Sequence, residues 1–183
     1  VYARFVYDRD AAPSFYDVIE PDDRLIFVNT FSKNWAMTGW RVGWISAPPE
    51  LGQVFENLVQ YNTSGVAAFL QRGAVAALAE GEDFFQMQLD RARKGRDILS
   101  DALSRSGRAS FAKPDGTFYL FFHIDGEDDA TDLAYRLVDE AGVGFAPGAT
   151  FGDVGRPFLR ACFMRDLDQV TEGAERIAEW LSR

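Results

Sequence analysis

The segment 30–44 carries most of the side chains in this sequence that could do chemistry on a small ligand. Lys33 supplies a primary amine, Arg41 a permanent planar cation, and Thr30 and Ser32 two hydroxyl groups. A guanidinium fork suits a phosphate, and hydroxyl groups donate hydrogen bonds to the same group. These residues therefore predict a phosphate-binding loop with an amine beside it, although hydroxyls in such a place often only cap the backbone.

The surroundings of Lys33 favour a reactive amine. We expect the neighbouring Arg41, together with partial burial among Phe31, Trp35 and Trp40, to disfavour the ammonium form of Lys33. A neutral lysine amine is a nucleophile toward carbonyl carbon. An aldehyde that also bears a phosphate would satisfy all of these groups together, whereas a lone lysine is usually a solvated surface residue.

Two predicted strands hold this segment in place. Residues 24–29 follow the turn-forming Pro-Asp-Asp at 21–23, and residues 42–46 end at two prolines. Loops between such elements commonly present ligand-binding groups. Helical patterns follow over about 50–60, over the Ala-rich run 66–78 and over a long amphipathic stretch that ends at Gly107.

The last third of the chain mixes strands and helices within a short space. We expect strands over 117–124, 143–146 and 158–163, a helix over 131–141 closed by Gly142, and a final helix that Asp166 caps. This order predicts a small α/β or α+β unit.

Beyond these patterns, the sequence resembles a known family. Ser32-Lys33 followed by Met-Thr-Gly-Trp-Arg-Val-Gly at 37–43 closely resembles the pyridoxal-phosphate lysine motif of class I and II aminotransferases. The runs Pro-Asp-Gly-Thr-Phe-Tyr at 114–119 and Pro-Gly-Ala-Thr-Phe-Gly at 147–152, with Phe-Leu-Arg at 158–160, are similar to later segments of the same family. The resemblance covers essentially the whole chain.

The resemblance implies a role for each candidate residue. Lys33 is implied as the catalytic residue that holds pyridoxal 5'-phosphate covalently, with Thr30, Ser32 and Arg41 at its phosphate. Tyr2 looks like the tyrosine that donates a hydrogen bond to the phenolic oxygen of the cofactor. Arg160 is similar to the arginine that binds the α-carboxylate of the substrate.

Some residues keep a second interpretation. The alternative for Tyr2 is an aromatic core residue whose hydroxyl is satisfied locally. Arg160 lies in an apolar strand and therefore needs a carboxylate partner, which could be an Asp or Glu of this chain in place of a substrate. His123 and Cys162 receive no role, and we expect Cys162 to be a small buried residue.

The fold implied is α/β, as the C-terminal part of a fold type I protein. Residues 1–65 would be a remnant of the large cofactor-binding domain, 66–106 inter-domain helices and 107–183 a small C-terminal α/β (α+β) domain. The run 2–7 reads as a strand with no preceding turn. The family aspartate that pairs with the pyridine nitrogen would precede Val1, so we expect the chain alone to bind cofactor poorly and to be inactive.

The implied activity is transfer of an amino group between an L-amino acid and a 2-oxo acid, within amino acid metabolism. Two alternatives stay open: another reaction of the same fold, such as a C–S β-lyase or a decarboxylase, and an aminotransferase-like sensor domain of a transcription regulator. Leu-Val-Gln at 58–60 stands where a dicarboxylate-specific relative has a further arginine, which puts aspartate specificity in doubt. A homodimer is also implied.

Composition excludes several other classes. The 183 residues carry a net charge of −9, so nothing favours binding to nucleic acid or to an acidic membrane surface. No apolar run reaches the roughly 20 residues that a bilayer span needs, and we expect a cytoplasmic protein. One cysteine and one histidine exclude an internal disulfide and a Cys/His zinc site.

Overall fold

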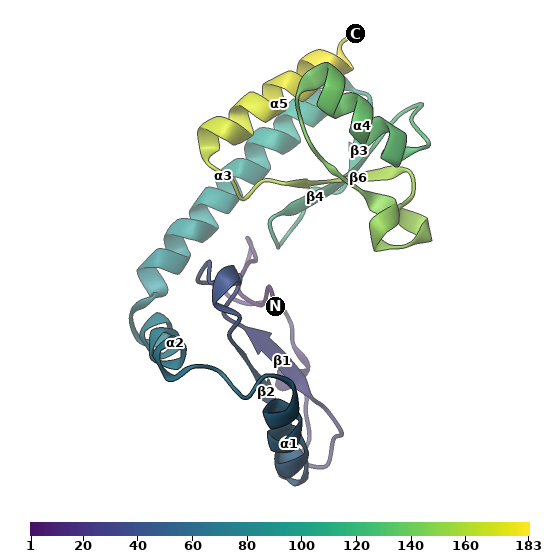
Figure 1. The fold of residues 1–183 in the computed structure, drawn as a ribbon. Coiled ribbons are helices and arrows are strands. Elements are labelled where there is room, and N and C mark those ends of the chain that lie inside the picture. Colours follow the sequence, from purple (N-terminus) through teal and green to yellow (C-terminus); the bar gives the residue numbers. More distant parts are fainter. The chain divides into compact units, whose positions relative to one another are not determined.

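A computed structural model describes residues 1–183, and the chain divides into two compact units, Val1–Gln88 and Leu89–Arg183 (Figure 1). The first unit contains two strands, β1 (Phe27–Thr30) and β2 (Gly43–Ser46), the helices α1 (Gly52–Asn62) and α2 (Ala68–Glu80), and short 3₁₀ turns at Phe15–Asp17, Thr38–Trp40 and Pro49–Leu51. The long helix α3 (Glu82–Ser106) begins in this unit and continues into the second.

Strands β1 and β2 pair antiparallel and bring the two ends of the segment 31–42 together. Phe27 lies opposite Ser46, and Thr30 lies opposite Gly43. A Cβ atom at position 43 would collide with the carbonyl oxygen of Asn29, so the close approach of the two backbones requires glycine there. The pairing of Thr30 with Gly43 therefore holds the two ends of the loop next to each other.

A small apolar cluster anchors that loop on α2. Buried Phe31, Met37 and Val42 from the loop pack with buried Ala74 from the helix. The indole of Trp40 occupies the space that a Cβ of Gly73 would need, and Trp35 lies in the same way against Gly81. Apolar burial thus fixes the loop, since its own backbone forms few hydrogen bonds.

The N-terminal residues do not form the strand expected over 2–7. The chain turns at residues 3–4, where the Phe5 N–H donates to the Tyr2 carbonyl, and only Val6 makes an isolated bridge. The turn buries Phe5 edge-on against Phe85, with ring centroids 5.5 Å apart. Arg4 pairs with Glu82 at 2.6 Å, so side chains of this turn contact the start of α3.

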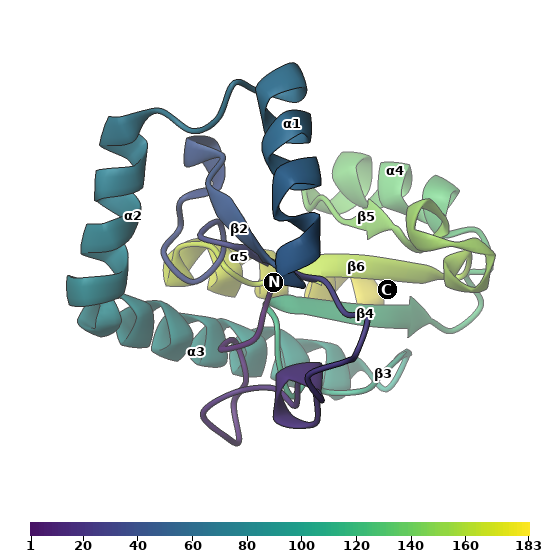
Figure 2. The same ribbon diagram turned by 90° about the horizontal axis from the view of Figure 1, so that it is seen from below.

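The second unit is a four-stranded antiparallel sheet with helices against it. The strands β3 (Ala109–Phe111), β4 (Tyr119–Ile124), β5 (Ala146–Pro147) and β6 (Phe158–Cys162) lie in the order β3-β4-β6-β5, and the helices α4 (Ala130–Ala141) and α5 (Leu167–Leu181) join α3. Figure 2 shows β4 and β6 side by side in front of α5. The predicted mixture of strands and helices in one small unit is confirmed.

Side chains of β4 and β6 alternate between a buried face and an open one. Leu120, Phe122 and Leu159 are almost fully buried, while Phe121 and Cys162 point to the open face and are exposed. The expectation of a buried Cys162 is therefore wrong: alternation along β6 puts it on the same face as Arg160, two residues earlier. The open face is thus available for function.

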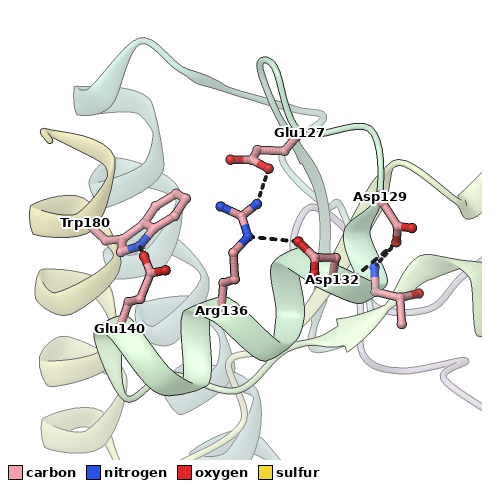
Figure 3. A network of polar contacts seen from close by, with 7 residues as sticks. Glu127, Asp129, Asp132, Arg136, Glu140 and Trp180 are labelled. Atoms are coloured by element: carbon pink, nitrogen blue, oxygen red, sulfur yellow. Dashed lines mark hydrogen bonds and ion pairs between the residues drawn. The ribbon is translucent and has the colours of Figure 1, made fainter.

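Polar contacts fix α4 at both ends (Figure 3). The Asp129 carboxylate accepts from the Thr131 and Asp132 N–H groups and caps the helix. Arg136 pairs with Asp132 and Glu127, and the hydrogen bond to Glu127 raises the pKa of the guanidinium. Figure 3 also shows the contact that joins α4 to α5, in which the Trp180 indole N–H donates to Glu140 at 2.7 Å.

The C-terminal ends of two helices agree with the predicted stop signals. Gly142 follows α4 with φ 66°, the left-handed conformation that glycine adopts without strain. Gly107 follows α3, which ends at Ser106, and also has φ 66°. None of the helices combines the length and apolar character needed to span a bilayer.

Candidate active site

The loop of residues 31–42 is closed at its neck by backbone and hydroxyl hydrogen bonds. The Phe31 N–H donates to the Val42 carbonyl at 3.1 Å. Thr30 Oγ1 accepts from the Ser32 N–H at 3.0 Å and donates to Ser32 Oγ at 2.9 Å. Because Ser32 Oγ is the acceptor in that bond, the Ser32 hydroxyl can still donate its own proton to another group, such as a ligand oxygen.

The structure brings Lys33 and Tyr2 together. Lys33 is half-buried, and its Nζ atom lies 5.9 Å from the centroid of the Tyr2 ring. The two residues are far apart in the sequence, so the fold of the first unit brings the Tyr2 ring near the Lys33 amine.

Arg41 leaves the other side of the loop neck in an unusual conformation. Its backbone is left-handed, with φ 55° and ψ 44°, and one of its guanidinium nitrogens donates to the Thr38 carbonyl at 3.0 Å. Ala36 in the same loop is also left-handed. A non-glycine residue in this region costs about 1–2 kcal/mol, which the packing of Met37 and Val42 must offset. The exposed guanidinium keeps further N–H donors for an anion.

Asn34 is a residue of this loop that sequence reasoning missed. Its side chain is 8% exposed, and its amide oxygen is buried without a hydrogen-bond partner. An unpaired buried acceptor is costly, so the Asn34 oxygen is a position at which a ligand or a water molecule could donate a hydrogen bond. Nothing in the sequence signals it, because an asparagine after a lysine is unremarkable until its burial is known.

The second unit holds Arg160 between two aromatic rings. The central carbon of its guanidinium lies 4.2 Å from the ring centroid of Tyr119 and 4.2 Å from that of Phe151. Arg160 forms no ion pair with an Asp or Glu of this chain. Its charge is thus held in position without an internal carboxylate to neutralise it.

The two residues that received no role lie apart from hydrogen-bonded networks. His123 is half-buried on β4, with Nδ1 3.8 Å from Asp125. Cys162 is a free, exposed thiol. Neither belongs to a group of side chains that could bind a metal ion.

The comparisons with known proteins decide the family. A sequence model of the family described as "Aminotransferase class I and II" matches residues 1–177. The chain belongs to the class I and II aminotransferases. The presence of the lysine motif, the Phe-Tyr strand and the later arginine in one chain agrees with this assignment.

Individual relatives are also aminotransferases by name. The chain is 33% identical over 182 residues to "Aspartate aminotransferase" of Thermotoga maritima, covering 100% of this chain and 46% of the relative. It is 30% identical to "Probable N-acetyl-LL-diaminopimelate aminotransferase" of Bacillus subtilis, covering 97% of this chain and 44% of that one. The chain therefore spans about half the length of these curated relatives.

Solved structures of this family share the fold. An aromatic aminotransferase from Pyrococcus horikoshii superposes with a TM-score of 0.91 at 28% identity, over 99% of this chain and 49% of that one. The Thermotoga maritima aspartate aminotransferase gives a TM-score of 0.88 at 30% identity, over 100% of this chain and 46% of that one. The expected fold, the C-terminal part of a fold type I aminotransferase, is thus confirmed.

Members of this aminotransferase family use pyridoxal phosphate. The loop, together with Thr30 and Tyr2, offers the groups that such a molecule requires: an amine for the aldehyde, hydroxyls and a guanidinium for the phosphate, and a phenol for the ring oxygen. The residues present therefore fit the cofactor.

Proposed function

We propose that the protein carrying this chain transfers an amino group between an L-amino acid and a 2-oxo acid, with pyridoxal 5'-phosphate as cofactor. The proposal rests on the family to which the chain belongs and on one observation of structure. Lys33 is half-buried in a loop whose ends are joined by the hydrogen bond from the Phe31 N–H to the Val42 carbonyl. Its Nζ atom lies 5.9 Å from the centroid of the Tyr2 ring.

In this proposal each residue of the loop has a separate task. Arg41 and the hydroxyls of Thr30 and Ser32 bind the phosphate, and Tyr2 donates to the ring oxygen. When bound, pyridoxal phosphate supplies an aldehyde that condenses with amines and a ring that accepts the electron pair left at the substrate α-carbon. Lys33 holds the cofactor at rest and moves the proton from that α-carbon during turnover, and Arg160 binds the α-carboxylate.

The relatives favour amino transfer over the other reactions considered. The curated relatives carry aminotransferase names, with aspartate and diaminopimelate among the named substrates. For this protein the substrates stay at the level of an amino acid and a 2-oxo acid. No feature of this structure specifically favours a β-lyase, a decarboxylase or a sensor domain over an aminotransferase.

Borohydride reduction of the full-length, cofactor-loaded protein tests the role of Lys33. Reduction should leave the cofactor covalently attached to the peptide that contains Lys33, as read by mass spectrometry. Lys33→Ala should lose that label and lower the rate of amino transfer by at least about a hundredfold, because it removes the proton-transfer group. Lys94→Ala, which removes an exposed lysine of α3, is the matched control. Full activity of Lys33→Ala would refute the proposal.

A homodimer in the cytoplasm forms a second part of the proposal. Apolar side chains on α1 and α2 support it, because Leu58, Phe69 and Val75 are at least half exposed. Unpartnered apolar helix faces of this kind are typical of protein contacts. Light scattering of the full-length protein should give twice the monomer mass, and Phe69→Glu should lower that mass.

A further inference from the structure

We propose that Tyr119 and Phe151 are positioning residues for Arg160, which hold its guanidinium so that its N–H edge binds the carboxylate of the amino acid. This inference rests on the proposed function, since that function supplies the carboxylate. Both aromatic residues lie in the family segments 114–119 and 147–152, and the inference gives them a role that the resemblance alone did not.

The two rings approach Arg160 from opposite sides of β6. Tyr119 belongs to β4, and Phe151 follows β5, while the sheet order places β6 between those strands. Each ring centroid is 4.2 Å from the guanidinium carbon, well within the range of a cation–π contact. These contacts hold the guanidinium against two rings without pairing its N–H donors with a carboxylate of this chain, so the donors can bind an anion.

Electrostatics distinguish this arrangement from an ion pair. A carboxylate beside Arg160 would fix the guanidinium but would also neutralise it and compete with the substrate. Aromatic rings attract the cation through their quadrupole and carry no net charge. The pair Tyr119 and Phe151 therefore orients Arg160 while its charge remains available to an incoming carboxylate.

Local backbone structure places Tyr119 under the guanidinium. Thr117 has a left-handed backbone with φ 62°, which is strained for a β-branched residue. Its hydroxyl oxygen accepts from the Tyr119 N–H at 3.2 Å. Tyr119 lies opposite Cys162 in the sheet, so its side chain reaches Arg160 as a diagonal neighbour.

Glycines place Phe151 on the other side. A Cβ on Gly148 would collide with the Gly155 carbonyl, and a Cβ on Gly155 would collide with Gly148. This mutual contact closes the loop that carries Phe151, and Gly152 after it has φ 125°, which favours glycine. Phe121 supports the ring edge-on, with centroids 6.4 Å apart. Both rings are thus held by the fold itself.

The test separates carboxylate binding from chemistry. In the full-length, cofactor-loaded protein, the absorbance change of the amino-donor half-reaction is followed with L-phenylalanine and L-aspartate, and with 2-phenylethylamine and β-alanine, which lack the α-carboxylate. Binding of 3-phenylpropionate and succinate is measured by calorimetry, because these carboxylates bind without an amine.

The variants are chosen to separate orientation from loss of fold. The double variant Tyr119→Leu with Phe151→Leu removes both rings. The single variant Tyr119→Phe keeps both rings and removes only the hydroxyl of Tyr119. Phe158→Leu is the matched control, because Phe158 lies on the same face of β6 but stacks on Phe121. Circular dichroism establishes that each variant folds.

We expect the double variant to raise the half-saturating concentration of the reactive amino acid about tenfold and to weaken carboxylate binding by a similar factor. The maximal rate and the reaction with the decarboxylated amines should change much less, and Tyr119→Phe and Phe158→Leu should behave like the wild type. Unchanged carboxylate binding in the double variant would overturn the inference, as would an equal loss for amino acids and for amines. If Lys33 is not trapped by borohydride but carboxylate binding still falls, the proposed function fails and the positioning role stands.

Discussion

The two units of this chain differ in how completely they bury their apolar side chains. Six of the buried apolar residues lie in Val1–Gln88, and the other twenty-two lie in Leu89–Arg183. In the first unit the strands expose Val28 and Ile45 by 66% and 49%. In the second, one face of the sheet is packed with Leu120, Phe122 and Leu159. Only the second unit has a core of ordinary size.

The same difference applies to the surroundings of the two main candidate residues, Arg160 and Lys33. Arg160 lies on the open face of a sheet whose other face is packed, and both rings that contact it come from the same unit. Lys33 lies in a loop that is anchored by a small cluster around Met37 and by the neck at Phe31 and Val42. We infer that the surroundings of Arg160 are pre-formed within the second unit, while the lysine loop depends on few contacts within the first.

The largest expected difference is in cooperative unfolding when the two units are produced as separate polypeptides. A polypeptide of residues 82–183, which keeps α3 whole, should unfold in a single cooperative transition because it contains nearly all of the buried core. Residues 1–88 alone should show no such transition. Thermal unfolding followed by near-ultraviolet circular dichroism checks both statements. A cooperative transition in 1–88 and none in 82–183 would reverse the comparison.

Single truncations should show the same contrast on a smaller scale. Leu120→Ala leaves a cavity in the packed face of the sheet and should lower the free energy of unfolding by about 2–5 kcal/mol. Val28→Ala on the exposed ribbon should change it by less than about 0.5 kcal/mol. Urea denaturation measures both. Equal costs would mean that Val28 is more buried in solution than in this structure.

The contact between α4 and α5 offers a finer test within the second unit. Glu140→Ala leaves the partly buried indole N–H of Trp180 without its acceptor and should cost about 1 kcal/mol. Glu140→Gln keeps an acceptor oxygen and serves as the control. A loss as large in Glu140→Gln as in Glu140→Ala would show that the charge of Glu140, rather than its hydrogen bond, matters.

The smallest expected effect is a titration in the first unit. Hydrogen bonds from Arg4, and then from Gln86, lower the pKa of Glu82 to about 2 from an ordinary 4.5. Because the folded value is the lower one, the pair stabilises the first unit above the ordinary value and loses that contribution as the pH falls toward about 2. Arg4→Met should move the pKa of Glu82 up toward 4.5, as read by NMR titration of its carboxyl carbon. An unmoved pKa would assign the shift to Gln86.

Helices and their ends were predictable because their signals are local. The helix predicted over 131–141 with a glycine stop is α4, which runs from Ala130 to Ala141, and the predicted cap Asp166 accepts from the Asp168 N–H at the start of α5. The first strand was less predictable. It begins at Phe27 rather than at residue 24, because only residues 27–30 have a partner in β2. Pairing is a non-local property that no short pattern contains.

For the candidate site, the sequence suggests which residues to consider but not the contacts that they make. The types and order of Thr30, Ser32, Lys33 and Arg41 point to a phosphate and an aldehyde by themselves. The left-handed backbone of Arg41 and the unpaired oxygen of Asn34 depend on how the loop packs on α2. The rings beside Arg160 were likewise hidden, because they come from a diagonal strand position and from a separate loop.

The placement of tryptophan gives this chain a built-in optical reporter. Trp35, Trp40 and Trp44 lie in the lysine loop or in the strand after it, and the remaining tryptophan, Trp180, lies in α5. Replacing Trp180 with phenylalanine would therefore confine all indole fluorescence to the neighbourhood of Lys33. Quenching of that emission would then follow the arrival of a chromophore at the loop in real time, without any external dye.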